Sequence, residues 1–412
     1  MSLLLPLDLT IKAPLSNSLL GLARLMTAVF KGEDISPTAS ELLAKAQLDD
    51  SNALLDLSVV LQLQGNKETA LAIQQEALSQ QQIFCLQPDN KTSTMKLLVI
   101  YTHGDLMTNT PVEFLAQGAG FELQILYIAD HLPLPSSLPE HDIAMVAISE
   151  LDRNLGCLPR VEQFINTLNV PVLNQPASIA RLSRDTISRR LQGLAGIEVP
   201  LTVRASYQQL VDYPFAELQE ALNAPTTFPI IIRPIDSHAG KQLAKVNNQA
   251  ELDEYLRNNP NDAYFIAPFV DYSNDEGMFK KYRIMVIQGK PYIAHMAVSE
   301  HWMIHYLNAG MIENAEKRFA EAQEMGRFEQ GFALKHQQAF STLAEHIGLD
   351  YFGIDCAQTQ QGELLIFEAC ASLNVHSMDC EKTFPYKKVQ MQKLFSAFEQ
   401  MLQDRSNAFK VS

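Results

Sequence analysis

The sequence predicts an α+β protein of several domains, and three features carry this prediction. The chain has 412 residues, more than one ordinary hydrophobic core accommodates, so we expect about two to four domains. Its first part repeats apolar residues at helical spacing, its middle part alternates short apolar strands with helices, and its last part contains long paired strands. We therefore expect a helical segment, then a parallel α/β domain, then a larger domain with antiparallel sheets.

Residues 16–84 are predicted to form helices, because apolar side chains recur every three or four positions. The stretch 51–84 makes one 34-residue unit in which small residues lie where two helices must approach, and Gly65-Asn66 forms the turn. This unit resembles a tetratricopeptide-like helical hairpin. A plain helical cap on the rest of the protein explains the same pattern, and both interpretations stay open. We assign residues 1–88 to this segment.

The middle of the chain predicts a Rossmann-like domain at about 95–175. A polar linker, 87–94, precedes it. Its expected strands are 96–101, 121–129, 142–148 and 171–174, and its expected helices are 110–120 and 159–169. Strands that alternate with helices of this length imply a parallel sheet. No GxGxxG motif occurs, so dinucleotide binding is not expected.

The last part, 176–412, predicts helices mixed with mainly antiparallel strands. The expected helices are 177–194, 206–222, 248–258, 313–325, 332–347 and 386–404. The expected strands include 228–234, 242–246, 263–270, YFGIDCAQ and ELLIFEAC. Residues 281–299 are predicted to form a β-hairpin with Gly289-Lys290 at its turn.

Composition narrows the classes of function. Apolar residues make up 47% of the chain and charged residues 19%, as in folded proteins. The 47 acidic and 32 basic residues leave a net charge of −15, which repels phosphate polymers and anionic lipid, so we expect neither nucleic acid nor a membrane as a partner. The five cysteines contain no CxxC pair, and the first residues lack a basic, uninterrupted signal segment. We therefore expect a cytoplasmic protein without structural disulfides or zinc.

A cationic strand end is the first candidate for a binding site. The apolar strand PIIIRP ends at Arg233, and the following loop contains Ser237, His238, Gly240 and Lys241. A guanidinium at a strand end pairs with phosphate oxygens, and small residues let backbone N–H groups approach the same anion. A solvated strand edge has the same pattern, so this motif alone leaves both interpretations open.

Two acids in otherwise apolar strands form the second candidate. Asp355 and Glu368 lie on either side of a tight QQGE turn. Carboxylates on neighbouring strands share a hard cation such as Mg²⁺, which keeps them ionised when they are partly buried. The alternative is that both acids point to solvent.

The segment 280–306 concentrates cations, histidines and aromatic side chains. Its basic residues are Lys280, Lys281 and Arg283. Its histidines and large aromatic residues after the turn include His295, His301, Trp302, His305 and Tyr306. Three cations in four residues of an acidic protein suit a phosphate group. His301 and His305 have the spacing of a helical metal pair but lack the glutamate of an HExxH motif, so structural histidines explain them as well.

In order and spacing, these elements resemble the ATP-grasp superfamily, in particular glutathione synthetase, the ribosomal-protein glutamate ligases and the D-alanine ligases. The similarity covers roughly 95–400 and begins with 170–203, which is similar to the family's lead into its nucleotide domain. It implies a pre-ATP-grasp domain at 95–175 and an ATP-grasp domain at 176–412. It also implies an ATP-dependent carboxylate–amine ligase that acts through an acyl phosphate on an amino acid, a peptide or a similar small substrate, with ATP and Mg²⁺ as cofactors.

The resemblance assigns roles to individual residues. The residues that fall on the ATP-phosphate site are Arg233, Ser237, His238, Gly240 and Lys241, with Arg184 near the family's earlier phosphate-binding lysine. Phe269 and Val270 match the hinge that holds adenine. Arg283, with Lys281 beside it, falls on the arginine that steadies the transferring phosphoryl group. The implied Mg²⁺ ligands are Asp355, Glu368 and Asn374, and the residues expected on the substrate side are His295, His301, Trp302 and His305.

Three positions depart from the family's pattern. Cys370 stands where an asparagine usually binds the metal, Asp185-Thr186 stand where a lysine is expected, and Pro268 replaces the hinge acid. These departures favour an alternative, a catalytically degenerate ATP-grasp scaffold that binds nucleotide or peptide and recruits a protein partner through its N-terminal helices. A kinase-like member that only phosphorylates its substrate is a third interpretation. Homo-oligomerisation stays open in all three.

Overall fold

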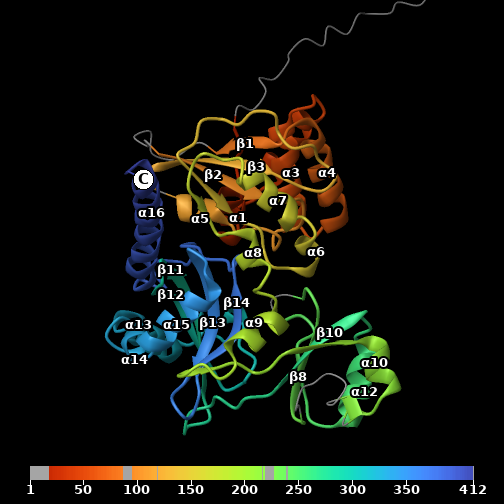
Figure 1. Ribbon diagram of the computed structural model, residues 1–412, viewed down its shortest axis with the longest axis vertical. Coiled ribbons are helices and arrows are strands. Elements are labelled where there is room, and N and C mark those ends of the chain that lie inside the picture. The colour runs from red at the N-terminus through yellow and green to blue at the C-terminus, as the bar shows by residue number, and fades with distance from the viewer. Residues whose placement is uncertain are drawn as a thin grey trace, which may run out of the picture.

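The computed structural model describes residues 18–86, 95–117, 119–215, 217–218, 227–237 and 240–411. Within these residues the strands form three sheets, which helices cover (Figure 1). The described chain opens with the helices α1 (Leu22–Phe30), α2 (Ser36–Ala46), α3 (Ser51–Leu63) and α4 (Lys67–Gln80). These helices confirm the helical prediction between Leu22 and Gln80, whereas residues 1–17 and 87–88 of the assigned segment lie outside the described residues.

The predicted helical hairpin is confirmed up to Gln80 and wrong beyond it. Helices α3 and α4 pack against each other around Gly65, whose φ of 83° suits a residue without a side chain. The last residues of the predicted unit instead form β1 (Ile83–Leu86), which pairs antiparallel with a strand of the first sheet. Phe84 drives this pairing because its ring is 1% exposed in the core beneath the sheet. The tetratricopeptide-like character of the helices stays a prediction.

The first sheet has the strand order β1-β3-β2-β4-β5. Its further strands are β2 (Met95–Tyr101), β3 (Phe121–Tyr127), β4 (Ile143–Val146) and β5 (Val172–Leu173), which run parallel. Its helices are α5 (Val112–Ala116), α6 (Asp152–Leu155) and α7 (Leu158–Ile165). The predicted parallel α/β arrangement is thus confirmed, and the predicted linker 87–94 lies outside the described residues.

The second sheet is antiparallel, with the order β7-β10-β8-β9. Its elements are β7 (Val203–Ser206), α10 (Tyr207–Asp212), β8 (Ile230–Pro234), β9 (Ala244–Val246), α12 (Gln249–Asn258) and β10 (Ala263–Pro268). The prediction of one helix over 206–222 is wrong in length, because α10 ends at Asp212. Part of the remainder lies outside the described residues.

The third sheet has the order β12-β11-β13-β14-β6. Its strands are β6 (Ile197–Glu198), β11 (Phe279–Ile287), β12 (Lys290–Ser299), β13 (Tyr351–Gln358) and β14 (Leu364–Cys370). The predicted hairpin is confirmed, but its turn is Gln288-Gly289 rather than Gly289-Lys290. Both residues have positive φ, 48° and 76°, as a tight two-residue hairpin turn requires.

The remaining helices correct two predicted spans. They are α8 (Pro176–Ile179), α9 (Arg184–Leu191), α13 (Ala315–Gly326), α14 (Phe332–Lys335), α15 (Gln337–Ile347) and α16 (Lys387–Val411), with a single 3-10 turn at Tyr306–Asn308. The predicted helix 177–194 is divided into α8 and α9, and the predicted helix 332–347 is divided at His336. His336 is 4% exposed, and its ring contacts Phe332 with centroids 4.5 Å apart, so its burial bends the chain there.

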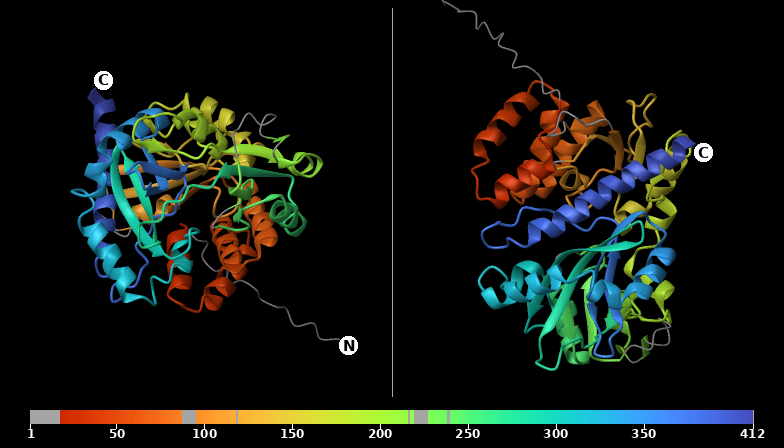
Figure 2. Two further views of the ribbon diagram at one scale, coloured as in Figure 1. Left: turned by 90° about the horizontal axis from the view of Figure 1, so that it is seen from below. Right: turned by 90° about the vertical axis from the view of Figure 1, so that its left-hand side faces the viewer.

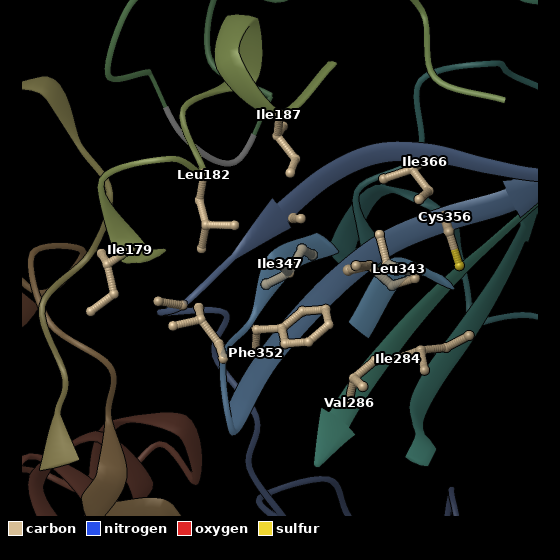
Figure 3. Packing of buried hydrophobic residues seen from close by; sticks show 14 of the residues in the cluster. Ile179, Leu182, Ile187, Ile284, Val286, Leu343, Ile347, Phe352, Cys356 and Ile366 are labelled. Atoms are coloured by element: carbon tan, nitrogen blue, oxygen red, sulfur yellow. The ribbon is translucent and has the colours of Figure 1, made fainter. Parts of the chain in front are cut away.

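The first and third sheets share their hydrophobic cores, whereas the second sheet has its own. One shared core includes Ile179 and Ile187 beside Ile284, Val286 and Phe352 (Figure 3). In the second shared core α16 lies between the two sheets, as the right-hand view of Figure 2 shows. A separate cluster of apolar residues holds the second sheet together with α10 and α12. Polar contacts rather than a common core join the second sheet to the other two sheets.

Two buried acids anchor the start of α1. The Asp56 carboxylate accepts hydrogen bonds from the backbone N–H groups of Leu20 and Gly21, at 2.7 and 3.0 Å, and Glu113 accepts one from Ala23 at 3.0 Å. Gly21 is required here, because a Cβ at this position would lie 2.6 Å from Glu113 Oε2. Burial raises the pKa of Asp56 to about 6 and that of Glu113 to about 7.

This anchor predicts a pH dependence of stability. The pKa of Glu113 rises from 4.5 to about 7 on folding, so the folded state binds the proton more tightly between these values. Stability from this group is therefore full below about pH 4.5 and is lost as the pH rises from there through about 7, about 3 kcal/mol in all at about 1.4 kcal/mol per pKa unit. We expect Glu113→Gln to unfold at a higher temperature than wild type at pH 8 and at nearly the same temperature at pH 5. Equal shifts at both pH values in thermal melts would contradict this assignment.

No helix in the described part of the chain is long and apolar enough to cross a membrane.

Candidate functional site

The site forms where three neighbouring strands place charged residues in one row. Arg283 on β11 is the register partner of Asp355 on β13, and Asp355 is the register partner of Glu368 on β14. Register partners on adjacent strands project to the same face of a sheet. A break in register follows directly after Arg283 and another after Asp355, and such bulges re-aim side chains next to functional sites.

Asp355 lies between two cations. Its carboxylate accepts from Arg283 Nε and Nη2, at 2.8 and 3.1 Å, and from Lys281 Nζ at 2.8 Å. The Asp355 side chain is 5% exposed, and the arginine pairing is bidentate, which makes it the stronger kind of charged hydrogen bond. Burial raises the pKa of Asp355, but the Arg283 guanidinium and the Lys281 ammonium lower it well below its usual range. Asp355 is therefore ionised at neutral pH.

Glu368 has a different partner, Arg184 at the start of α9. Arg184 Nη2 forms an ion pair with Glu368, and Arg184 Nη1 donates to the carbonyl oxygen of Phe367 at 3.0 Å. A third acid, Glu150, reaches this place from the first sheet and accepts from the backbone N–H of Ala371 at 3.1 Å. Burial raises the pKa of Glu150.

The sequence prediction did not include Glu150, although one signal pointed to it. The residue follows β4 at the carboxyl end of a parallel strand, and ligands of open α/β sheets bind outside these ends. Cys370 lies beside it, and burial raises the pKa of the thiol well above its ordinary value. The thiol therefore stays protonated, which makes Cys370 a poor ligand for a hard cation.

Arg233 lies near this group at the end of β8. Its guanidinium donates to Ser237 Oγ at 3.0 Å and to the Ser237 carbonyl oxygen. These two hydrogen bonds connect the end of the strand to the loop that follows it. Burial, followed by the neighbouring charge of Arg184, lowers the pKa of Arg233. Lys241 is exposed, Gly240 has a φ of 70°, and His238 lies outside the described residues.

The predicted adenine hinge follows β10. The backbone N–H of Phe269 already donates to the carbonyl oxygen of Pro229 at 3.0 Å, and Val270 packs beside the buried Tyr272. Lys245 on β9 lies over the Phe269 ring, with its Nζ 3.6 Å from the ring centroid. Lys245 is a cation near the hinge that the sequence pattern did not single out.

The four predicted substrate residues lie in three places. His295 is the register partner of Arg283, and its ring contacts Tyr306 with centroids 4.6 Å apart. Burial, and after it the charges of Lys281 and Arg283, lower the pKa of His305. His305 therefore also lies near these two cations. Trp302 instead lies by the hinge, edge-on to Phe269 with centroids 5.8 Å apart. His301 is exposed, and its backbone N–H donates to Ser299 Oγ at 3.0 Å.

The donor set suits a hard cation. Asp355 and Glu368 supply carboxylate oxygens at paired positions, and Asn374 Oδ1 is buried without a hydrogen-bond partner. An unpartnered buried oxygen calls for a ligand or an ion. The backbone oxygen of Asn374 accepts from Arg283 Nη1 at 3.2 Å, which ties this residue to the row of charges. Among the described residues, no group of three or more histidine, cysteine, aspartate and glutamate side chains could hold a metal ion.

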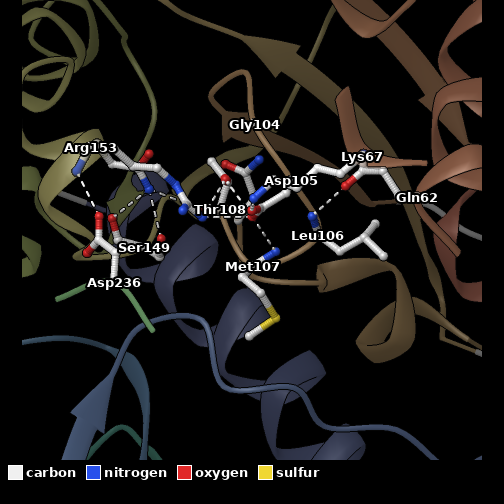
Figure 4. Close-up of polar contacts among 12 residues, drawn as sticks. Gln62, Lys67, Gly104, Asp105, Leu106, Met107, Thr108, Ser149, Arg153 and Asp236 are labelled. Carbon is white, nitrogen blue, oxygen red and sulfur yellow. Dashed lines mark hydrogen bonds and ion pairs between the residues drawn. The ribbon is translucent and has the colours of Figure 1, made fainter. Parts of the chain in front are cut away.

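A polar latch joins the second sheet to the first sheet at α6 (Figure 4). The Asp236 carboxylate, just after β8, accepts from the backbone N–H groups of Asp152 and Arg153 at 3.0 and 3.3 Å. Arg204 on β7 pairs with the Asp152 carboxylate and with Asp185 at 2.9 Å. These contacts hold the strand end that carries Arg233 against the first sheet.

The latch continues towards the N-terminal helices. Arg153 Nη2 donates to Asp105 at 2.7 Å, and Lys67 at the start of α4 pairs with the other oxygen of Asp105. Gln62 and Gln74 accept from the backbone N–H groups of Leu106 and Gly104, at 2.9 and 2.8 Å. One face of α3 and α4 is therefore already occupied by the loop after β2.

The latch predicts a change in ligand affinity. Asp236→Gly removes the carboxylate and tolerates the φ of 57° at this position. We expect the second sheet to dock less firmly and the affinity for an ATP analogue to fall about three- to tenfold, as for loss of one or two charged hydrogen bonds. Asp275→Gly, at an exposed position before β11, is the control and should bind as wild type does. Calorimetry checks this, and equal affinities for the two variants would contradict the latch.

No protein-family model and no curated protein sequence matches the chain. Solved structures with a similar arrangement include the following three. They are a RimK-domain ATP-grasp protein from Sphaerobacter thermophilus DSM 20745 (13% identity, TM-score 0.42, 75% of this chain and 99% of that one), the VanG D-Ala:D-Ser ligase from Enterococcus faecalis (16%, 0.45, 76% and 99%) and the D-alanine–D-alanine ligase from Bacillus anthracis complexed with ATP (16%, 0.46, 77% and 98%). The TM-scores describe a partial likeness, so the functional assignment depends on the site itself.

Proposed function

We propose that this chain is an ATP-grasp ligase that joins a carboxylate to an amine with consumption of ATP. The observation that carries the proposal is a cluster of cations and acids from separate elements around one end of the third sheet. Its members are Arg184, Arg233, Lys281, Arg283, Asp355 and Glu368. In a chain with a net charge of −15, such a local excess of cations suits a small polyphosphate.

The proposed reaction has two steps. The carboxylate of the first substrate attacks the γ-phosphorus of ATP, the bond to the β-phosphate oxygen breaks, and an acyl phosphate and ADP form. The amine of the second substrate then attacks the acyl carbon and loses a proton as inorganic phosphate leaves. Both steps depend on positioning and on neutralisation of charge.

Each residue has a place in this scheme. Arg233 and the loop with Ser237, His238, Gly240 and Lys241 bind the phosphates, and Phe269 and Val270 contact adenine. Arg283 and Lys281 offset the charge that develops on the transferring phosphoryl group. Asp355, Glu368 and Asn374 hold Mg²⁺, which supplies further neutralisation of phosphate charge when bound. The substrate is an amino acid, a peptide or a similar small molecule.

Two observations favour a second candidate, a degenerate scaffold that binds nucleotide or peptide without ligation. Cys370 carries a protonated thiol where a metal-binding side chain is expected. Both oxygens of Asp355 already accept from Arg283 and Lys281. In this case the N-terminal helices recruit a protein partner through a face other than the one that the Asp105 loop covers.

Product analysis separates these functions. The protein is incubated with ATP, Mg²⁺ and pairs of amino acids or short peptides, and ADP and inorganic phosphate are both measured. A ligase releases ADP and phosphate in equal amounts only when a productive pair is present, whereas a kinase releases ADP without phosphate. ATP binding without any ADP release would refute the ligase proposal and leave the scaffold.

The substrate side gives a prediction of its own. His301 is exposed next to the strand that carries His295, and we place both around the substrate together with His305. Trp302 contacts Phe269, so we place it on the side of the substrate that faces the hinge. His301→Ala should raise the KM for the amino substrate about tenfold and leave kcat nearly unchanged, since the contact is made equally in the ground state and the transition state. Steady-state kinetics check this, and an unchanged KM would remove His301 from the site.

A further inference from the structure

Arg184 lies against Glu368 in the place where a divalent cation would contact this acid. Its guanidinium forms an ion pair with the Glu368 carboxylate and also donates to the carbonyl oxygen of Phe367 at 3.0 Å. The two charged side chains are 24% and 23% exposed, so the ion pair is largely shielded from water. Arg184 thus makes two contacts with β14, an ion pair with a side chain and a hydrogen bond to a backbone carbonyl oxygen.

The surroundings of Arg184 are acidic on one side and basic on the other. Its charge interacts with Glu150 and Asp355, and it also acts on the neighbouring Arg233. With Arg184 present, the charge of Glu368 is neutralised inside the protein. A divalent ion that approached Glu368 would meet a fixed positive charge at short range in a partly buried site, where screening by water is weak.

A bound polyphosphate would compete with Glu368 for the positive charge of Arg184. Guanidinium groups bind phosphate oxygens through two parallel hydrogen bonds. Negative phosphate charge bound at Arg233 therefore also attracts the neighbouring Arg184, away from Glu368. Once the guanidinium contacts phosphate, the Glu368 carboxylate is left without its partner. An uncompensated buried carboxylate is costly, so its affinity for a cation rises.

We propose that Arg184 is an internal counterion that keeps a divalent cation off Glu368 until a polyphosphate draws the guanidinium away. The proposal rests on the function proposed above and adds an order of binding to it. The free ion does not bind to the protein alone, and the nucleotide enters first or together with the ion. Arg184 then links the metal site to the phosphate site and prevents a metal-loaded state without nucleotide.

The test measures Mn²⁺ binding to the full chain in the absence of nucleotide, by the electron paramagnetic resonance signal of the free ion. The compared proteins are wild type, Arg184→Gln and Arg189→Gln. Both variants lose one positive charge from α9, but Arg189 is exposed and Arg184 is not. We expect Arg184→Gln to bind Mn²⁺ at least about tenfold more tightly than the other two proteins, because a unit charge at short range is removed from the site.

Equal Mn²⁺ affinity of wild type and Arg184→Gln overturns the proposal, and so does an equal gain in Arg189→Gln, which would be a general charge effect. If Arg184→Gln does not fold, as judged by its thermal melt, Arg184→Met replaces it. Methionine also removes the positive charge while it keeps an unbranched side chain, and an unchanged Mn²⁺ affinity in that variant overturns the proposal equally. Calorimetry with a non-hydrolysable ATP analogue in the presence of Mg²⁺ is the separate arm. Absence of nucleotide binding there refutes the proposed function, whatever the Mn²⁺ result.

Discussion

Replacement of Arg283 by alanine should lower the rate of substrate-dependent ADP release by at least about a hundredfold, as for loss of one fixed transition-state cation. Arg283 is held in place by a bidentate pair with Asp355 and by the carbonyl oxygen of Asn374. Because these contacts fix the guanidinium before any ligand arrives, we expect it to stabilise developing charge in the proposed reaction without reorganisation. ADP release measured at saturating ATP checks this effect.

Because Arg283 makes these contacts, its replacement by alanine also lowers the stability of the fold. Arg283→Ala leaves the buried Asp355 carboxylate with Lys281 as its remaining cation. Removal of one partner of a buried pair costs about 3 kcal/mol or more of stability. Arg283→Lys is therefore the cleaner variant, since it keeps the charge and loses the bidentate geometry.

A control on the same strand completes the Arg283 experiment. Lys280 is 39% exposed and pairs only weakly with Glu324, at 3.4 Å. Lys280→Ala should retain the wild-type rate of ADP release. Full turnover in Arg283→Lys and Arg283→Ala, both folded, would remove Arg283 from the chemistry.

The largest expected loss of stability is at Phe398 on α16. Its ring is 0% exposed and contacts Phe121 of the first sheet and Tyr351 of the third sheet, with centroids 6.2 and 5.2 Å apart. Phe398→Ala leaves a cavity between the two sheets, and such changes cost about 3 to 5 kcal/mol. We expect a clear decrease in the denaturant concentration at the midpoint of unfolding.

Val389, on the same helix, provides the control for Phe398. Its side chain is 61% exposed, so Val389→Ala should change stability by less than about 0.5 kcal/mol. If both variants unfold at the same denaturant concentration as wild type, α16 does not unite the two sheets.

Sequence patterns predicted the regular elements of this protein well, because helical and strand periodicity follow directly from which side chains are buried. The predictions of secondary structure were wrong where tertiary contacts, rather than local sequence, determine the conformation of the backbone. Residues 83 and 84 end the predicted helical region but belong to β1, because residues 83–86 pair with β3 at the edge of the first sheet. His336 interrupts a helix because its burial against Phe332 outweighs local propensity.

The residues of the site likewise include some that the sequence pattern predicted and some that it did not. The spacing of Asp355 and Glu368 around a short turn predicted that they are neighbours, and the strand register places them side by side. Their partners were not predictable from spacing. Arg184 lies 184 residues before Glu368 in the chain, and Glu150 reaches the group from another sheet. Only the packing of the first sheet on the third brings these residues together.

The most direct test of the whole account is anomalous diffraction from Mn²⁺ in crystals grown with a non-hydrolysable ATP analogue. We predict one nucleotide with its phosphates on Arg233 and an anomalous peak within bonding distance of Asp355 and Glu368, with Arg184 turned from Glu368 to the phosphates. A nucleotide bound elsewhere, or an anomalous peak far from these two acids, would contradict the proposed site.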